Sequence, residues 1–333
     1  MKPRAAIAGA GLMGFWHAQS IAPAGGTVVA VFDREAAAAQ RLAGKFPGAR
    51  AGTDPAALLD PEKIDVLHLC TPTASHHDLA AAALVRGIHV LVEKPLAPTA
   101  AETAQLCALA AARRVQLCPV HQFPFQRGAR QARAGLGRIG GLRHFEARFC
   151  SAGGAGRSAA ELDTIVADIL PHPLSLLRQF APGSLQEGGW NVHRPAPGEF
   201  HATRTADGVG CSILISMNTR PTATSLQLLG STGTIHVDLF HGYCVVEPGD
   251  VSRWRKIAHP FDLAARTFFA ASRNLVTRAV QGESAYPGLR HLIAQFYASL
   301  DGRGSPPVSP EEAVAIAAVR DRLICVDPPA VHA

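Results

Sequence analysis

Three glycines near the start of the chain have the spacing of a phosphate-binding loop. They belong to a G-x-G-x-x-G run that follows an apolar stretch and opens a helix-like one: Gly9-Ala10-Gly11-Leu12-Met13-Gly14. In this setting the first glycine permits a tight turn, the second lets the backbone approach a pyrophosphate, and the third lets helix and strand pack closely. The start of the helix would then face the phosphate charge. The run therefore predicts that residues 9–14, Leu12 and Met13 included, bind a dinucleotide.

An acidic residue follows at the distance that such a loop requires. Asp33 ends a valine-rich stretch nineteen residues past Gly14. A carboxylate there accepts hydrogen bonds from the adenine-ribose hydroxyls and repels a 2′-phosphate, so we expect NAD. Arg34 keeps NADP open as an alternative, because an adjacent arginine can stack on adenine or hold that phosphate. Arg34 is equally consistent with a solvated loop residue.

Polar residues also follow two later strand-like runs. Thr71-Pro72 comes after residues 66–70, with His76 soon after, and Glu93-Lys94 ends residues 89–92 before Pro95. The carboxyl ends of parallel strands form the edge where a dinucleotide binds, so we expect Thr71, Pro72, His76, Glu93 and Lys94 near the cofactor. Taken alone, His76 is more typical of a helix start, and Glu93-Lys94 of an ion pair before a proline turn.

The elements that must position these residues alternate between strand and helix over the first 120 residues. We expect strands at 5–8, 27–32, 66–70, 89–92 and 115–118. We expect helices at 12–21, 36–45, 79–86 and 99–113, the last opened by a capping box of Thr99 and Glu102. Such alternation predicts a doubly wound parallel sheet.

The pattern changes after residue 120. We expect a strand at 142–149, a period-2 strand at 209–217 and a hairpin of 226–229 with 234–239. Helices are expected at 263–280, 289–300 and 311–323. These features predict an α+β domain with a largely antiparallel open sheet. The domain division is therefore 1–120 and 121–333.

Composition excludes several other classes of protein. The net charge is +6, but the basic residues are scattered and aromatic residues make up 6% of the chain, so we expect no nucleic-acid partner. The seven cysteines form no C-x-x-C pair and are odd in number, which indicates reduced thiols and no metal site. No signal-peptide pattern and no membrane-spanning apolar run are seen, so we expect a cytoplasmic protein without a membrane partner.

The chain resembles the Gfo/Idh/MocA family, named for glucose–fructose oxidoreductase, inositol dehydrogenase and a rhizopine catabolism protein. The resemblance extends over nearly the whole chain. The residues that carry it are Gly9, Gly11 and Gly14, Thr71-Pro72 with His76, the run Gly87 to Pro95 that contains Glu93-Lys94-Pro95, Gly137 to Gly140, and Gly230 to Thr234. The fold it implies is an N-terminal Rossmann domain with a C-terminal α+β domain.

The resemblance implies catalytic roles for Lys94 and for Asp168 and His172, which match the family's Asp-x-x-x-His motif. The chemistry agrees with these residue types. Removal of a hydride from a secondary alcohol needs a base for the hydroxyl proton, and a neutral histidine suits that task. A lysine ammonium can stabilise the developing alkoxide, and a carboxylate can orient the histidine.

Two segments depart from the family pattern. The family commonly has a glycine two residues after the aspartate, whereas this chain has Pro171 and Pro173 around His172. Since proline fits a first helical turn, His172 is expected at a helix N-terminus, with a structural Pro-His-Pro kink as the alternative. Relatives often have arginine and asparagine where this chain has His121, Gln122 and Phe123. We expect these three to line the substrate pocket together with Lys94, Asp168 and His172.

The resulting hypothesis is an NAD(P)-dependent oxidoreductase. It transfers a hydride between nicotinamide and a hydroxyl or ketone carbon of a sugar, a cyclitol or a sugar derivative. A reductase of an imine or a conjugated double bond is one alternative, and a non-catalytic dinucleotide-binding regulator is another. By analogy with relatives, we expect a homodimer or homotetramer formed through the open sheet of the second domain.

Overall fold

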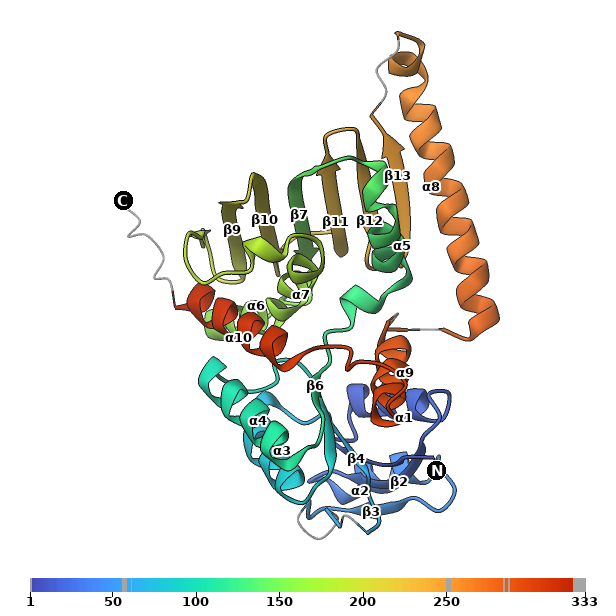
Figure 1. Ribbon diagram of the computed structural model, residues 1–333, viewed down its shortest axis with the longest axis vertical. Helices are drawn as coiled ribbons and strands as arrows, with labels where there is room; N and C mark the ends of the chain where they lie inside the picture. The colour runs from blue at the N-terminus through green and yellow to red at the C-terminus, as the bar shows by residue number, and fades with distance from the viewer. Residues whose placement is uncertain are drawn as a thin grey trace. The chain divides into compact units, whose positions relative to one another are not determined.

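The chain forms two compact units in a computed structural model, which describes residues 2–55, 59–60, 62–249, 253–283, 285–286 and 288–325. The first unit contains residues up to 121 and also residues 289–318, and the second contains residues 122–288 and those from 319 onward. The sequence-based division at residue 120 differs in one respect, since it assigned 289–318 to the second domain. The segment belongs to the first unit because α9 (Leu289–Leu300) buries its apolar face against α1 (Leu12–Ile21), as Figure 1 shows.

The sheet of the first unit is parallel throughout, with the strand order β3-β2-β1-β4-β5-β6. Its strands are β1 Arg4–Ala8, β2 Thr27–Phe32, β3 Arg50–Gly52, β4 Val66–Leu69, β5 His89–Val92 and β6 Leu117–Pro119. The inner strands consist almost entirely of buried apolar residues, because helices cover both faces. The predicted doubly wound sheet is confirmed, and β3, a short exposed edge strand, is the one that the sequence pattern missed.

Helices connect the strands of this sheet. They are α1, α2 Ala36–Ala43, the short η1 Thr73–Ser75, α3 His76–Val85 and α4 Ala100–Arg113. Figure 1 shows α3 and α4 side by side. Thr99 and Glu102 form the predicted capping box of α4. The prediction for α3 was three residues late at its start, because His76 itself begins the helix.

The second unit is built on a seven-stranded sheet with the order β13-β12-β11-β7-β10-β9-β8. Its strands are β7 Leu142–Cys150, β8 Asn191–His193, β9 Glu199–Ala206, β10 Val209–Ser216, β11 Ala223–Gly230, β12 Gly233–Asp238 and β13 Tyr243–Pro248. All neighbours pair antiparallel except β7 and β10, which are parallel. The predicted largely antiparallel sheet is confirmed. On β7, Phe145, Ala147 and Phe149 are buried and the residues between them are exposed.

Helices cover one face of this sheet and one of its edges. They are α5 Arg127–Gly135, α6 Ala159–Ile169, α7 Pro171–Phe180 and α8 Arg253–Gln281, with short η2 Phe123–Phe125, η3 Leu136–Arg138 and η4 Pro182–Ser184. In Figure 1, α5, α6 and α7 lie over the sheet, and α8 runs along the edge strand β13. The last helix, α10 Pro310–Ile324, begins in the first unit and ends in the second.

Candidate functional site

A cavity of about 590 Å³ opens at the carboxyl ends of β1, β2 and β4 in the first unit. Several of the predicted cofactor residues lie in its wall, namely Gly9, Gly11, Asp33, Arg34, Thr71 and Pro72. Thr53, Pro55, Cys70 and Ser75 line it as well, and sequence reasoning did not find them. Thr53 and Pro55 follow β3. They would have been predicted as cavity residues if that short strand had been recognised in the sequence.

The glycine loop has the geometry that the motif predicts. Gly9 has a φ of +97°, and a Cβ there would lie 2.5 Å from the carbonyl oxygen of Cys70. A Cβ on Gly14 would collide with the carbonyl oxygen of Gly9. A Cβ on Gly11 would meet nothing within 4 Å, and no side chain caps the start of α1. Open space and uncapped N–H groups therefore coincide where a pyrophosphate has to bind, so the loop fits the group.

Asp33 is held against this loop by two backbone groups. Its Oδ2 accepts a hydrogen bond from the N–H of Ala10 at 2.7 Å, and its Oδ1 accepts one from the N–H of Glu35 at 2.9 Å. Each carboxylate oxygen keeps a further lone pair for a ribose hydroxyl. Arg34, in the same wall, is exposed and forms no ion pair within the described part of the chain.

Two other groups, His76 and Cys70, shape this edge of the sheet. His76 is buried, and its ring nitrogens lie 2.8 Å from the carbonyl oxygens of Thr71 and Pro95. It joins the loops that follow β4 and β5, which makes it a brace for the predicted cofactor residues. Burial raises the pKa of Cys70 well above its usual value, so its thiol stays uncharged.

A buried chain of hydrogen bonds links Glu93 to side chains of α1, β4 and α9. The Nε2 of His17 lies 3.0 Å from Oε1 of Glu93, and its Nδ1 lies 2.9 Å from Nδ1 of His68. The Nε2 of His68 lies 2.7 Å from the hydroxyl of Tyr297 on α9. Both histidines are fully buried, and Tyr297 is 2% exposed.

The acceptor at the end of this chain identifies one of its donors. The Glu93 carboxylate only accepts, so the Nε2–H of His17 donates to it. Burial and the adjacent His17 lower the pKa of His68 well below its usual value, so His68 is neutral and only one of its two ring nitrogens carries a proton. Its bonds to Nδ1 of His17 and to the hydroxyl of Tyr297, whose pKa is raised by burial, therefore run in one common direction along the chain, which the tautomer sets. Sequence reasoning missed His17, His68 and Tyr297, because a lone histidine in an apolar run resembles a core residue.

Lys94 follows Glu93 directly at the end of β5. Its backbone N–H lies 3.3 Å from Oε2 of Glu93, so the same carboxylate that ends the buried chain also holds the Lys94 backbone. His121 follows the next strand, β6. Burial and the positive charge of Lys94 lower the pKa of His121 to about 3, so this histidine is neutral over the physiological range.

The remaining predicted residues lie in the second unit. His172 is the second residue of α7, which begins at Pro171, so the expected helix start is found. The helix α6 ends at Ile169, and Asp168 and His172 therefore flank the junction of two helices rather than sharing one regular helix. The ring of His172 meets Phe123 edge-on at 4.4 Å between centroids and is parallel to Phe149 at 6.2 Å.

Two glutamines beside η2 have buried oxygens without a hydrogen-bond partner in the part of the chain that the structure describes. They are Oε1 of Gln122, a predicted substrate residue, and Oε1 of Gln126, which sequence reasoning missed. A buried carbonyl oxygen left unpaired costs about 1–3 kcal/mol. An external donor, such as a ligand hydroxyl, would remove that penalty.

The structure thus brings the predicted residues together in two groups. In the first unit, the glycine loop, Asp33 and Thr71-Pro72 surround one cavity. Glu93-Lys94 follows the neighbouring strand β5, and His121 follows β6. In the second unit, Phe123 contacts His172 directly, and Gln122 precedes Phe123 at the N-cap of η2.

Residues 3–121 match the family model described as "Oxidoreductase family, NAD-binding Rossmann fold". An inositol 2-dehydrogenase of Saccharopolyspora erythraea is 41% identical over 97 residues, which are 28% of this chain and 29% of that protein. A scyllo-inositol 2-dehydrogenase (NADP+) of Bacillus subtilis is 25% identical over 64% of this chain and 69% of its own length.

The alignment with the first of these relatives therefore spans less than a third of that protein's length. The fold agrees over a much longer stretch. A levoglucosan dehydrogenase solved with NADH and levoglucosan has a TM-score of 0.78 at 17% identity, with 97% of this chain and 96% of that chain covered. The prediction of an NAD-binding Rossmann domain is confirmed.

Proposed function

Because the chain belongs to the Gfo/Idh/MocA oxidoreductase family, we propose that it is an NAD(P)-dependent dehydrogenase acting on a secondary hydroxyl of a sugar or cyclitol. The observation that carries the proposal is the order of groups along one sheet edge. The cavity with the glycine loop and Asp33 lies at the ends of β2, β1 and β4, and Lys94 ends β5, the next strand. A cofactor with its phosphates at the loop would extend toward Lys94.

The cofactor would be held by the glycine loop and by Asp33, and its nicotinamide would accept or supply the hydride. The carboxylate of Asp33 favours NAD over NADP, because it repels a 2′-phosphate. The exposed guanidinium of Arg34 can partly offset that repulsion, so we propose NAD as the preferred cofactor and not the exclusive one.

Lys94 has the character of a group that stabilises negative charge on the reacting oxygen. Its backbone is held by Glu93, and Glu93 is held by the chain of His17, His68 and Tyr297, so the loop is rigid before substrate arrives. His121 remains neutral and adds no like charge near the ammonium. A preorganised ammonium needs no rearrangement as alkoxide charge develops.

His172 is proposed as the base that takes the hydroxyl proton, with Asp168 as the carboxylate that orients the imidazole or binds a neighbouring hydroxyl. Phe123 and Phe149 restrict the His172 ring from two sides. The buried oxygens of Gln122 and Gln126 are acceptors, and a polyol supplies several hydroxyl donors at once. A polyhydroxylated substrate matches this set better than an apolar imine or enone.

We further propose that the enzyme works in the cytoplasm as a homo-oligomer. The seven cysteines are all free thiols, which suits a reducing compartment. Within the residues that the structure describes, no helix combines the length and the hydropathy needed to cross a bilayer.

The test is a substrate screen with the purified full-length protein. NADH formation is followed with NAD+ and a panel of inositols, aldoses, glycosides and sugar acids, and with NADH and cyclic imines or enones in the reverse direction. Saturable oxidation of a polyol supports the proposal. Turnover of imines or enones alone would contradict the proposal and indicate a reductase of those bonds. Tight NADH binding without any turnover would contradict it and indicate a non-catalytic dinucleotide-binding regulator.

A further inference from the structure

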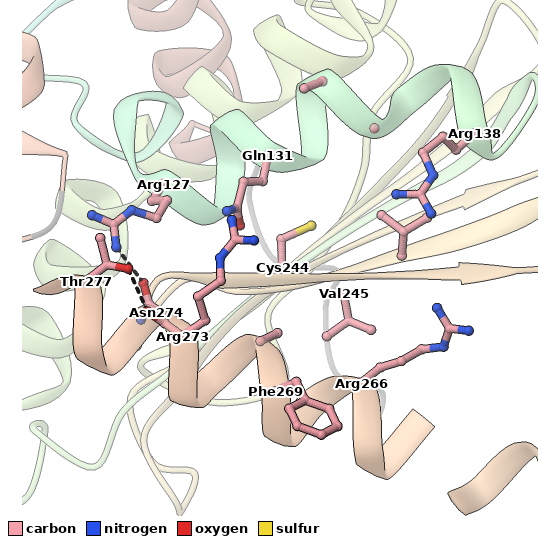
Figure 2. Close-up of a pocket in the computed structure, with 14 residues that line it drawn as sticks. Arg127, Gln131, Arg138, Cys244, Val245, Arg266, Phe269, Arg273, Asn274 and Thr277 are labelled. Carbon is pink, nitrogen blue, oxygen red and sulfur yellow. Dashed lines mark hydrogen bonds between the residues drawn. The ribbon is translucent and has the colours of Figure 1, made fainter. Parts of the chain in front are cut away.

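A cavity of about 650 Å³ lies between α5 and α8 of the second unit. Figure 2 shows Arg127 and Gln131 of α5, Arg266 and Arg273 of α8, and Cys244 of β13 around it. The volume falls within the roughly 300–1,000 Å³ of sites that bind small molecules. None of the described residues in its wall has a role in the proposed reaction, and it shares no lining residue with the cofactor cavity. The proposed function therefore assigns this cavity no ligand.

One face of each helix forms the wall of the cavity. Arg127 and Gln131 lie four residues apart on α5, and Arg138 follows in η3. Arg266 and Arg273 lie seven residues apart on α8. Residues at these intervals lie on the same side of an α-helix. Helical periodicity therefore brings four guanidinium groups to one cavity from two sides.

Hydrogen bonds beside the cavity hold the two helices in place. Nη1 of Arg127 donates to Oδ1 of Asn274 at 3.3 Å, and Nδ2 of Asn274 donates to the carbonyl oxygen of His241 at 2.8 Å. The side chain of Asn274 is buried. Because this link between α5 and α8 is made by the protein itself, the cavity is formed before a ligand binds, as is usual for small-molecule sites.

The wall contains four guanidinium groups and, among its described residues, no carboxylate. Acidic residues beside the cavity pair with two of the four. Nε of Arg266 lies 2.7 Å from Oδ2 of Asp262, and Nη2 of Arg127 lies 3.9 Å from Oε2 of Glu283. The other two arginines have to be accounted for separately.

Arg138 and Arg273 have no counter-ion in the described part of the chain, and their guanidinium groups form no hydrogen bond there. The thiol of Cys244, close to Arg138, cannot serve as one, because burial raises its pKa to about 11. Glu247, an acidic residue of β13, is already engaged by two histidines at 2.9 and 3.2 Å. Two guanidinium groups at this cavity are therefore available to an external anion.

The charge of these two groups favours phosphate. Guanidinium groups bind both carboxylates and phosphates through paired N–H donors. A phosphate monoester carries about −1.5 to −2 charges at pH 7 and can neutralise both arginines, whereas a monocarboxylate can neutralise only one. The amide of Gln131, which has no hydrogen-bond partner among the described residues, adds a neutral donor to the same wall.

The remainder of the wall is apolar. Val245 and Val246 of β13 contribute to it, together with Phe269 of α8 and the small side chains of Ala134 and Ala270. Inorganic phosphate would fill only part of the cavity and would leave this apolar surface in contact with water. A ligand with an apolar or aromatic body would cover it, with a gain from the hydrophobic effect and from aromatic contact.

We propose that the cavity between α5 and α8 binds a small organic phosphate. Its phosphate group binds Arg138, Arg273 and the amide of Gln131, and its apolar or aromatic body packs against Phe269 and Val245. A cleft lined by charges of one sign concentrates ligands of the opposite sign, so the surplus arginines also attract the ligand. This site is additional to the cofactor cavity of the first unit.

Isothermal titration calorimetry of the full-length protein tests the assignment, with phenyl phosphate as the probe and NADH present to occupy the cofactor site. Saturable binding of phenyl phosphate is expected. Benzoate, which carries a single charge, and inorganic phosphate, which lacks the apolar body, should bind more weakly. Arg138→Gln combined with Arg273→Gln should weaken phenyl phosphate binding by about tenfold or more. The matched control is Arg130→Gln with Arg133→Gln, which removes the same charge from exposed positions of α5 outside the wall and should bind as wild type.

Two further measurements locate the probe. Phe269→Ala should weaken phenyl phosphate binding by a few fold and leave inorganic phosphate binding unchanged, and Phe268→Ala, its exposed neighbour outside the wall, is the control. Phenyl phosphate should also slow alkylation of Cys244 and not that of the exposed Cys325, as followed by peptide mass spectrometry. Circular dichroism verifies that each variant is folded.

Several outcomes would overturn the proposal. Phenyl phosphate might show no saturable binding at millimolar concentration, or the two double-arginine variants might lose affinity equally, which would indicate attraction by general positive charge. Benzoate that binds as tightly as phenyl phosphate would overturn the assignment of phosphate, and inorganic phosphate that binds as tightly would overturn that of an organic body. No readout depends on turnover, so the site can fail or succeed independently of the proposed reaction.

Discussion

The cofactor edge of the first unit and the cluster around His172 in the second unit are built in different ways. At the cofactor edge, the groups that hold the loops are paired within the protein. Asp33 binds two backbone N–H groups, His76 binds two carbonyls, and Glu93 ends a closed chain of hydrogen bonds. In the second unit, buried oxygens of Gln122 and Gln126 lack hydrogen-bond partners among the described residues. The cofactor loops of the first region are thus held by internal pairs before any ligand binds, whereas the second region has acceptors that a substrate can satisfy.

This difference indicates a division of labour. A paired, rigid edge suits a cofactor that is the same in every turnover. An underpaired cluster suits a variable substrate, because each unpaired acceptor penalises a ligand that lacks the matching hydroxyl. The predictions below test whether the two regions separate in this way, in order of decreasing expected effect.

The largest effect is expected at Lys94. Lys94→Ala removes the ammonium that stabilises alkoxide charge, so kcat should fall by about 10²–10⁴-fold while NADH binding stays within about twofold. Steady-state kinetics and NADH fluorescence titration provide the two readouts. Lys63→Ala, an exposed lysine paired with Asp60, is the control and should behave as wild type. Retention of more than half of the wild-type kcat would remove Lys94 from the mechanism.

His172→Asn should lower kcat for alcohol oxidation by about 10²-fold or more, because it removes the base. In wild type, log kcat/KM for oxidation should rise with pH and level off once His172 is neutral. The variant should lose this titration and keep its fold. His144→Asn, an exposed histidine on β7, serves as the matched control. An unchanged pH profile in the His172 variant would show that another group takes the proton.

Asp33→Ala tests the cofactor edge alone. It removes the ribose acceptor and the repulsion of a 2′-phosphate, so Kd for NADH should rise by roughly 10–100-fold while Kd for NADPH changes less. KM for the polyol should stay near its wild-type value. Asp78→Ala, a highly exposed aspartate at the start of α3, should alter neither cofactor. A wild type that already prefers NADPH would contradict the assignment of NAD.

Tyr297→Phe removes the hydroxyl that begins the buried chain. An unpaired Nε2 on buried His68 should destabilise folding by about 1–3 kcal/mol in chemical denaturation. If the chain positions Lys94, kcat should also fall by a few fold with the Kd for NADH unchanged. Tyr243→Phe in the second unit is the control. A loss of stability without any change in kcat would limit the chain to a structural role.

The smallest effect is a pH dependence of stability. His68 and His121 both have lowered pKa values in the folded state, the latter about 3, so unfolding lets them take up protons below about pH 6.5. Their contribution is fully present above that pH and is lost as the pH falls toward the folded pKa, by up to about 1.4 kcal/mol per pH unit for each histidine. Thermal unfolding between pH 7 and pH 5 should show this slope, and His121→Gln should reduce it. An equal slope in that variant would contradict the assignment for His121.

The sequence by itself determined the doubly wound parallel sheet of the first unit and, at its cofactor edge, the glycine loop, Asp33 and Thr71-Pro72. That was achievable because the glycine spacing, Asp33 and the strand ends encode local geometry: a tight turn, an uncapped helix start and the edge of a parallel sheet. The alternation along β10 likewise predicted which side of that strand is buried.

Only the tertiary structure decided the rest, since it depends on contacts between distant residues. The chain of His17, His68 and Tyr297 joins α1, β4 and α9, and no spacing in the sequence relates a residue of α9 to a strand 229 positions earlier. The return of α9 to the first unit, the parallel pairing of β7 with β10 and the unpaired oxygens of Gln122 and Gln126 follow from packing in the same way. The exposure of large apolar side chains on α8, such as Phe261 and Val280, belongs to this group too, because helical periodicity predicts an apolar face but not whether it is buried.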